Sequence, residues 1–105
     1  MAVTHQVDVS GIGAFLFKSR TLRDQFRIEA EALRILGGPV DDEALRSGAI
    51  AFAALIVLTV EAPEGWDLDS FDPLDPDDTA KVFTVHRSLR DAELRFRAGP
   101  VGRRA

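Results

Sequence analysis

The spacing of apolar residues near the start of the chain predicts two short strands. Apolar and polar side chains alternate from Val3 to Val9, as they do in a strand with one buried face. The segment Ser10–Gly13 supplies turn residues, and alternation resumes with two phenylalanines in Ala14–Lys18. We therefore predict a β-hairpin over residues 1–20, which must pack on other elements because a lone hairpin is marginal in water.

The spacing then changes to that of a helix from Thr21 to Leu36. Thr21 is a suitable N-cap, and Asp24 places a carboxylate near the positive end of the helix. Gly37-Gly38-Pro39 ends the pattern. The charged outer face holds Arg23, Arg27, Glu31 and Arg34. We expect the core-facing stripe to hold Leu22, Phe26, Ala30, Leu33, Ile35 and Leu36.

The middle of the chain is its most apolar part. Residues from Ala49 to Val60 are apolar except for Thr59, within a second helix that begins near Asp41 or Asp42 and ends before Pro63. A dozen residues are too few for a membrane span, which needs about 20. We predict a helix buried on most sides at the centre of the fold. Alternatively, part of this surface is exposed and pairs with a second subunit, so self-association stays open.

A third helix is predicted to begin around Asp75. Pro76 suits a first helical turn, and the two following aspartates favour the helix dipole. The helix should run toward Gly99-Pro100, followed by a flexible tail over residues 99–105. Its apolar positions are Val82, Phe83, Val85, Leu89, Ala92 and Phe96.

Length and composition place these elements in one small globular domain, residues 1–105. Hydrophobic residues make up 46% of the chain and charged residues 29%, an ordinary proportion for a folded domain. The fold class is therefore α+β, mainly α: a hairpin (1–20) followed by a helical core (21–98). Cysteine is absent, which excludes disulfides and thiolate metal sites. The start of the sequence lacks the pattern of an export signal, so we expect a cytoplasmic protein.

The segment Glu61–Asp78, hereafter the acidic connector, joins the second and third helical patterns. It holds eight acidic residues, no basic residue, three prolines and the only tryptophan of the chain. Such acidity without aromatic residues is typical of disorder, whereas Trp66 and Phe71 indicate an ordered segment. These two aromatic residues either pin the connector to the core or anchor a protein partner.

Charge is distributed unevenly along the chain. Residues 1–60 carry a formal net charge of −1, the acidic connector −8, and residues 79–105 carry +5. The connector would repel phosphate, which argues against nucleic acid as a partner. Either the basic third helix folds over the connector and neutralises it, or the two form a polar rim that binds a protein. The candidate partner-binding residues are Trp66, Phe71, Asp67, Asp69, Arg87 and Arg90.

No catalytic, cofactor or metal site is predicted from the motifs. His5 and His86 are too far apart in sequence to indicate a metal site, and His86 has no evident nucleophile or orienting partner. Gly11-Ile12-Gly13 lacks the ending of a phosphate-binding loop and indicates a turn. The aspartates of the connector lack the order of a calcium loop, so helix capping and a solvated acidic face are the better interpretation.

The succession of segments resembles a known family. TLRDQFRIEAEALRILGG is followed by an apolar helix, then LTVEAPEGWDLDSFDPLD, then FTVHRSLRDAELRFR. This order, from about Phe15 to Arg97, is similar to that of the small tail assembly chaperones of long-tailed bacteriophages and prophages. The segments RTLRDQF and APEGWDLD carry most of the likeness. The family has no short binding motif that can be carried over residue by residue.

The resemblance implies a largely helical, non-enzymatic factor in the host cytoplasm. It would bind the long tape-measure protein, keep it soluble, help recruit tail-tube subunits and be absent from the finished particle. Many members also exist in a longer frameshifted form. The alternatives are a structural tail or neck component that stays in the particle, and a small bacterial regulator that binds another protein.

Overall fold

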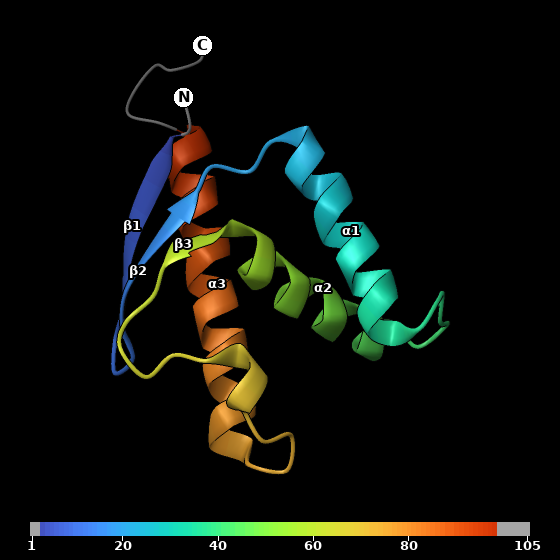
Figure 1. Ribbon diagram of the computed structural model, residues 1–105. Helices are drawn as coiled ribbons and strands as arrows, with labels where there is room; N and C mark the ends of the chain where they lie inside the picture. Colours follow the sequence, from blue (N-terminus) through green and yellow to red (C-terminus); the bar gives the residue numbers. More distant parts are fainter. Residues whose placement is uncertain (1–2, 99–105) are drawn as a thin grey trace.

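The computed structural model describes residues 3–98, so the tail expected over 99–105 lies outside the described residues. The chain forms a three-stranded antiparallel sheet and three α-helices, which confirms the α+β, mainly α class (Figure 1). The elements are β1 (Thr4–Val9), β2 (Gly13–Lys18), α1 (Leu22–Leu36), α2 (Glu43–Leu58), β3 (Thr59–Glu61), the 3-10 turn η1 (Leu68–Ser70) and α3 (Pro76–Ala98).

The predicted hairpin is confirmed. β1 and β2 pair with Val7 opposite Phe15 and Val9 opposite Gly13. Alternate side chains of both strands point into the core, where Phe15 and Phe17 are fully buried and their rings stack with centroids 5.5 Å apart. The period-two pattern therefore gave both the strands and their buried face.

The third strand was not predicted. The helix expected to continue through Val60 ends at Leu58, and the chain then extends so that Thr59 pairs with Phe17 of β2. Thr59 and Val60 are β-branched, which favours the extended form over another helical turn. The pairing occupies the second edge of β2, and a contact between such distant segments leaves no local signal in the sequence.

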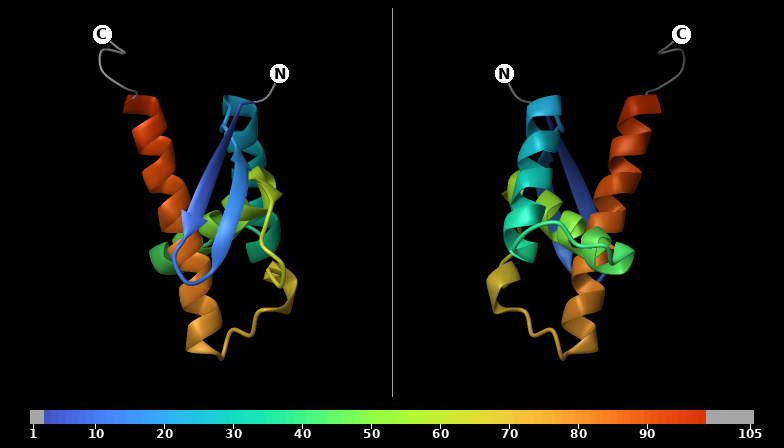
Figure 2. Two further views of the ribbon diagram at one scale, coloured as in Figure 1. Left: turned by 90° about the vertical axis from the view of Figure 1, so that its left-hand side faces the viewer. Right: turned by 90° about the vertical axis from the view of Figure 1, so that its right-hand side faces the viewer.

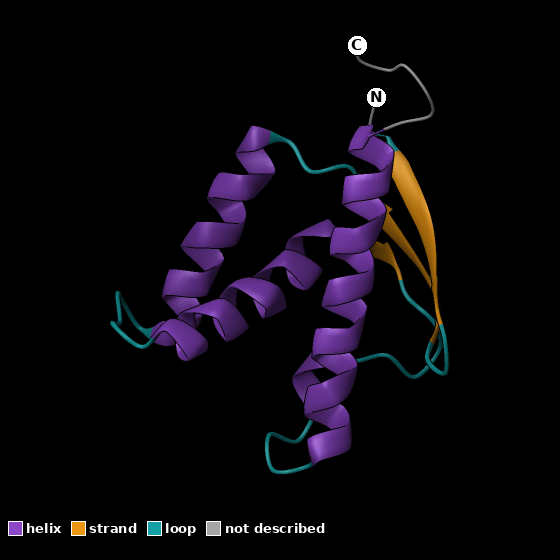
Figure 3. Ribbon diagram, turned by 180° about the vertical axis from the view of Figure 1, so that it is seen from behind, coloured by secondary structure: helices purple, strands orange, loops and turns teal. Residues whose placement is uncertain are grey.

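Helix α2 lies at the centre of the molecule, as predicted. It runs between α1 and α3 toward the sheet (Figure 3). Its buried residues are Ala49, Ala51, Ala53, Ala54, Leu55 and Leu58. The small alanine side chains allow neighbouring elements to approach on several sides, and one continuous core results. Within residues 3–98, no helix is both long and apolar enough to cross a bilayer.

Helix α1 buries a different face from the one expected. Its buried residues are Asp24, Ile28 and Ala32, whereas most of the predicted stripe is exposed, including Leu22, Phe26, Ala30, Leu33 and Ile35. The apolar residues of α1 cover about half of its circumference, and the helix makes extensive contact only with α2. One neighbour can cover only one row of side chains, so the second row faces solvent.

Helix α3 begins at Pro76, in agreement with the prediction. Val82, Val85, Leu89 and Ala92 are buried against α2 and the sheet. Phe83 and Phe96, the other two apolar positions named for this helix, are exposed. Phe83 is 43% exposed, although the tip of its ring lies close to Gly48 of α2. Phe96 lies near the end of the helix, where its ring and that of His5 form a T-shaped pair with centroids 4.5 Å apart.

The central position of α2 predicts a large difference between two adjacent residues. Leu55 is 1% exposed and Ile56 is 43% exposed. We expect Leu55→Ala to lower the free energy of unfolding by about 2–5 kcal/mol, because it leaves a cavity. Ile56→Ala is the matched control and should cost less than about 1 kcal/mol. Urea denaturation measures both, and a cost below about 0.5 kcal/mol at Leu55 would contradict the buried position of α2.

Candidate functional site

The acidic connector is an ordered segment whose carboxylates cap its own turns. It descends from the sheet to the start of α3 (Figure 2). Asp67 accepts a hydrogen bond from the backbone N–H of Asp69 at the start of η1, and Asp78 accepts one from the N–H of Asp72 at 2.9 Å. Asp72 and Asp75 in turn accept from amides two residues further on. These hydrogen bonds explain how a segment of net charge −8 keeps a single backbone conformation.

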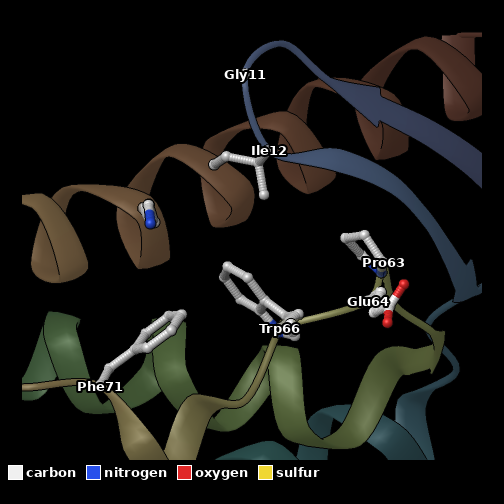
Figure 4. A pocket seen from close by; sticks show the side chains of 8 residues that line it. Gly11, Ile12, Pro63, Glu64, Trp66 and Phe71 are labelled. Atoms are coloured by element: carbon white, nitrogen blue, oxygen red, sulfur yellow. The ribbon is translucent and has the colours of Figure 1, made fainter.

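Trp66 ties the connector to the core. Its ring meets Phe15 of β2 edge to face, with centroids 5.0 Å apart, and meets Phe71 in the same geometry at 5.0 Å. Figure 4 shows the indole below Ile12 of the hairpin turn, with Phe71 beside it. Trp66 and Phe71 are half-buried. The contact with a fully buried phenylalanine gives Trp66 the position of a pin, while its remaining surface lines a pocket.

That pocket is small. It has a volume of about 140 Å³ and lies between the hairpin turn, Trp66, Phe71 and Lys81 of α3. Gly13 lets the connector approach the turn, because a Cβ there would lie 2.6 Å from the Cβ of Pro63. Its backbone φ of 141° also favours glycine. The space is below the range of about 300–1,000 Å³ typical of small-molecule sites, so it suits at most one side chain of a partner.

The structure brings together only some of the candidate partner-binding residues. Trp66, Asp67, Asp69 and Phe71 share the connector, and both aspartates are exposed. Arg87 and Arg90 lie further along α3, where Arg87 is exposed and Arg90 contacts Glu93. Arg87 is about 13 Å beyond Asp78 along the helix axis. Among residues 3–98, no ion pair joins the connector to α3.

A partly buried polar network connects the sheet to α1 and α3 at the other end of the molecule. Arg20, just after β2, binds Glu93 of α3 through two hydrogen bonds of 3.0 and 3.1 Å. Lys18 binds Asp24, which also accepts from the backbone N–H of Thr21 in a capping box. Burial tends to raise the pKa of Asp24, but the bonds from Lys18 and Thr21 outweigh it and hold that pKa below its ordinary value.

Both histidines lie near this network. Burial, followed by the charges of Arg20 and Arg90, lowers the pKa of His86 below its ordinary value. The Nε2 atom of His5 lies 3.3 Å from the hydroxyl of Ser19, a pair that the sequence did not indicate. In the described part of the chain, no carboxylate accepts a hydrogen bond from the imidazole of His5. Glu93 lines the same pocket as His5 and Ser19, but it binds Arg20. The pair closes the open end of the hairpin.

Across residues 3–98, no group of three or more histidine, aspartate or glutamate side chains converges in the manner of a metal site. The aspartates of the connector instead accept hydrogen bonds from backbone amides, as described above. Capping is therefore their observed role.

The main surface that sequence analysis missed is apolar. An open groove of about 180 Å³ runs between α1 and α2, lined by Ala32, Leu33, Leu36 and Ile50, with Glu29 and Arg46 on its rims. A second groove of about 210 Å³ lies between α2, the connector and α3. The spread of apolar residues over half of α1 was the available signal, because a single neighbour could not cover it.

Comparisons of the chain with known protein families, with curated proteins and with solved structures find no match.

The close approach of Gly13 to Pro63 makes a testable prediction about the connector. Gly13→Ala should push the connector away from the turn and expose Trp66, because the new methyl group collides with the proline ring. The fluorescence of Trp66, the only tryptophan, should shift to longer wavelength. Gly11→Ala is the control, since it also has a positive φ but nothing within 4 Å. Equal spectra for the two variants would contradict the pinning contact.

The Lys18–Asp24 pair predicts a pH-dependent contribution to stability. The folded-state pKa of Asp24 is depressed, so its contribution is fully present above the unfolded-state value of about 3.9 and is lost as the pH falls through the folded-state value. Asp24→Asn should lower the free energy of unfolding by about 1–2 kcal/mol at pH 7. The difference should shrink as the pH falls below the unfolded-state value. Urea denaturation at pH 7 and at a series of lower pH values measures this, and a difference that is unchanged throughout would contradict the charged pair.

Proposed function

We propose that this chain is a non-enzymatic protein-binding factor of the tail assembly chaperone type. It binds the tape-measure protein in the host cytoplasm and assists the recruitment of tail-tube subunits during tail assembly. The observation that carries the proposal is the open apolar groove between α1 and α2. The resemblance in the order of segments supplies the identity of the client.

The groove suits an amphipathic helix. Leu33 is 46% exposed and Ile50 is 36% exposed on its two walls, and Ala32 forms a shallow floor between them. A client helix can place apolar side chains spaced by three or four residues into such a groove. A long helical client needs this kind of surface, because its own apolar stripe is otherwise open to aggregation.

The rims of the groove supply charges of both signs. Glu29 lies on the α1 side and Arg46 on the α2 side, where Arg46 also contacts Glu43 at 2.7 Å. Exposed charges at a rim contribute little affinity but favour one orientation of the bound helix. The groove thus combines an apolar centre with a polar edge, which is the usual anatomy of a protein-binding site.

The two buried carboxylates in the described part of the chain, Asp24 and Glu93, are held in ion pairs. This arrangement suits a structural role for them better than a catalytic one. Arg20 and Glu93 neutralise each other, and Lys18 neutralises Asp24. The groove between α1 and α2 and the groove between α2, the connector and α3 are open at the surface, and within residues 3–98 their linings hold no convergent set of nucleophile, base and orienting group.

Co-expression with the tape-measure protein of the same genome tests the proposal. We expect a soluble complex that is captured through a tag on this chain. Leu33→Asp combined with Ile50→Asp should weaken binding by at least about 2 kcal/mol, because it places charges in the apolar centre. Leu94→Asp, at an exposed apolar position on α3, is the matched control and should bind normally.

Three outcomes of this experiment separate the alternatives. Failure of the tape-measure protein to become soluble or to be captured contradicts the chaperone function. Detection of this chain in purified particles by mass spectrometry favours a structural tail or neck component instead. Loss of binding by folded Trp66→Ala and Phe71→Ala, with normal binding by the groove variant, would move the client site to the connector.

A further inference from the structure

The first two turns of α1 present an exposed apolar knob flanked by arginines. Phe26 is 63% exposed and Leu22 is 72% exposed. Apolar side chains of this size are usually much less exposed in a folded protein. Arg23 makes no ion pair within residues 3–98, and Arg27 has only a 3.8 Å contact with Asp24, which Lys18 already neutralises. This end of α1 is therefore apolar and basic, and no other part of residues 3–98 covers it.

The opposite end of the molecule carries a hollow of complementary character. The groove of about 210 Å³ between α2, the connector and α3 is lined mainly by aromatic and aliphatic side chains, including Phe52, Phe71 and Phe83. A cavity of about 150 Å³ is enough to hold a benzene ring, so a phenylalanine side chain fits. Asp72 and Asp78 stand at its edge, within the most acidic segment of the chain. The hollow is therefore apolar and acidic.

The hollow depends on a glycine in α2. Gly48 lines it, and a Cβ at this position would meet only the tip of Phe83 at 3.7 Å, an ordinary van der Waals distance. Glycine inside a helix costs about 1 kcal/mol relative to alanine. Packing within residues 3–98 does not require it, since a methyl group would be accommodated. Its absence of a side chain keeps the floor of the hollow open.

We propose that copies of this chain associate head to tail, with Phe26 of one copy seated in the hollow beside Gly48 of the next. Arg23 and Arg27 then face Asp72 and Asp78 across the rim. The start of α1 and the start of α3 lie at opposite ends of the molecule (Figure 1), so one chain cannot fill its own hollow. Because the two surfaces differ, the contact is heterologous and leads to open chains or rings and not to a closed two-fold dimer.

This association does not require the client groove. Leu33 and Ile50, which carry the proposed function, lie beyond the knob, near the second half of α1. The two proposals can therefore fail independently, because one concerns the purified chain alone.

Complementary variants test the head-to-tail contact. Phe26→Ser removes the knob and leaves the hollow, while Gly48→Leu fills the hollow and leaves the knob. In sedimentation velocity, the unaltered chain should form species larger than a dimer as its concentration rises, and each variant alone should remain monomeric. An equimolar mixture of the two variants should form a discrete heterodimer, since one intact knob and one intact hollow remain.

Further variants supply the controls. Gly48→Ala should weaken association less than Gly48→Leu does, because a methyl group takes up less of the hollow than an isobutyl group. Leu94→Ser should associate normally, because it alters an exposed apolar residue elsewhere. Arg23→Glu should raise the dissociation constant about tenfold at low salt, with a smaller effect at high salt. If Gly48→Leu does not fold, Phe83→Lys replaces it, since it places a positive charge opposite the arginines.

Two results would overturn the proposal. The first is an unaltered chain that stays monomeric at every concentration, which would leave the knob to a different protein. The second is an association of the unaltered chain in which the mixed variants fail to pair, which would indicate a symmetric contact between α1 helices.

Discussion

The fold depends on the burial of one alanine-rich, apolar helix. α2 must be covered on several sides, and the sheet, α1 and α3 do so within a chain of 105 residues. The sheet, α1 and α3 each pack one face against α2. The chain has no further layer of secondary structure within residues 3–98 to cover their outer faces. Because no further layer covers them, apolar side chains on the outer faces of α1 and α3 remain exposed, as is common in a small domain. The surfaces proposed for binding are thus a consequence of how the core is built.

Polar contacts decide which face of α1 points inward. The Lys18–Asp24 pair and the Thr21 capping box fix the rotation of the first turn, and the turn carries Ile28 and Ala32 onto α2. The Arg20–Glu93 pair fixes the end of α3 against the same junction. Such pairs add little net stability once desolvation is counted, but removing one partner is costly, so they specify position. Once this face of α1 is fixed against α2, the opposite face points outward and leaves Phe26 and Leu33 exposed to solvent.

Local signals in the sequence were sufficient for the hairpin, for α2 and for the start of α3. Period-two alternation, an uninterrupted apolar run and Pro76 in a first turn each act within a few residues. The strand after Leu58 depends on pairing with β2, far away in sequence, and could not be read locally. The buried side of α1 could not be read either, because periodicity marks an apolar arc without saying which half of it meets α2. At the site, composition indicated that the acidic connector is ordered, but not that Arg87 and Arg90 lie away from it.

The outer face of α1 is an open apolar surface, and we propose that a partner covers it. Because the chain has no cysteine, single cysteines report on that face cleanly. Leu33→Cys should react rapidly with a thiol reagent in the free protein, and Ile28→Cys, on the buried face, at least about 100-fold more slowly. Addition of the tape-measure protein should slow the reaction at position 33. Slow reaction of Leu33→Cys in the free protein, or a rate unchanged by the tape-measure protein, would contradict this account.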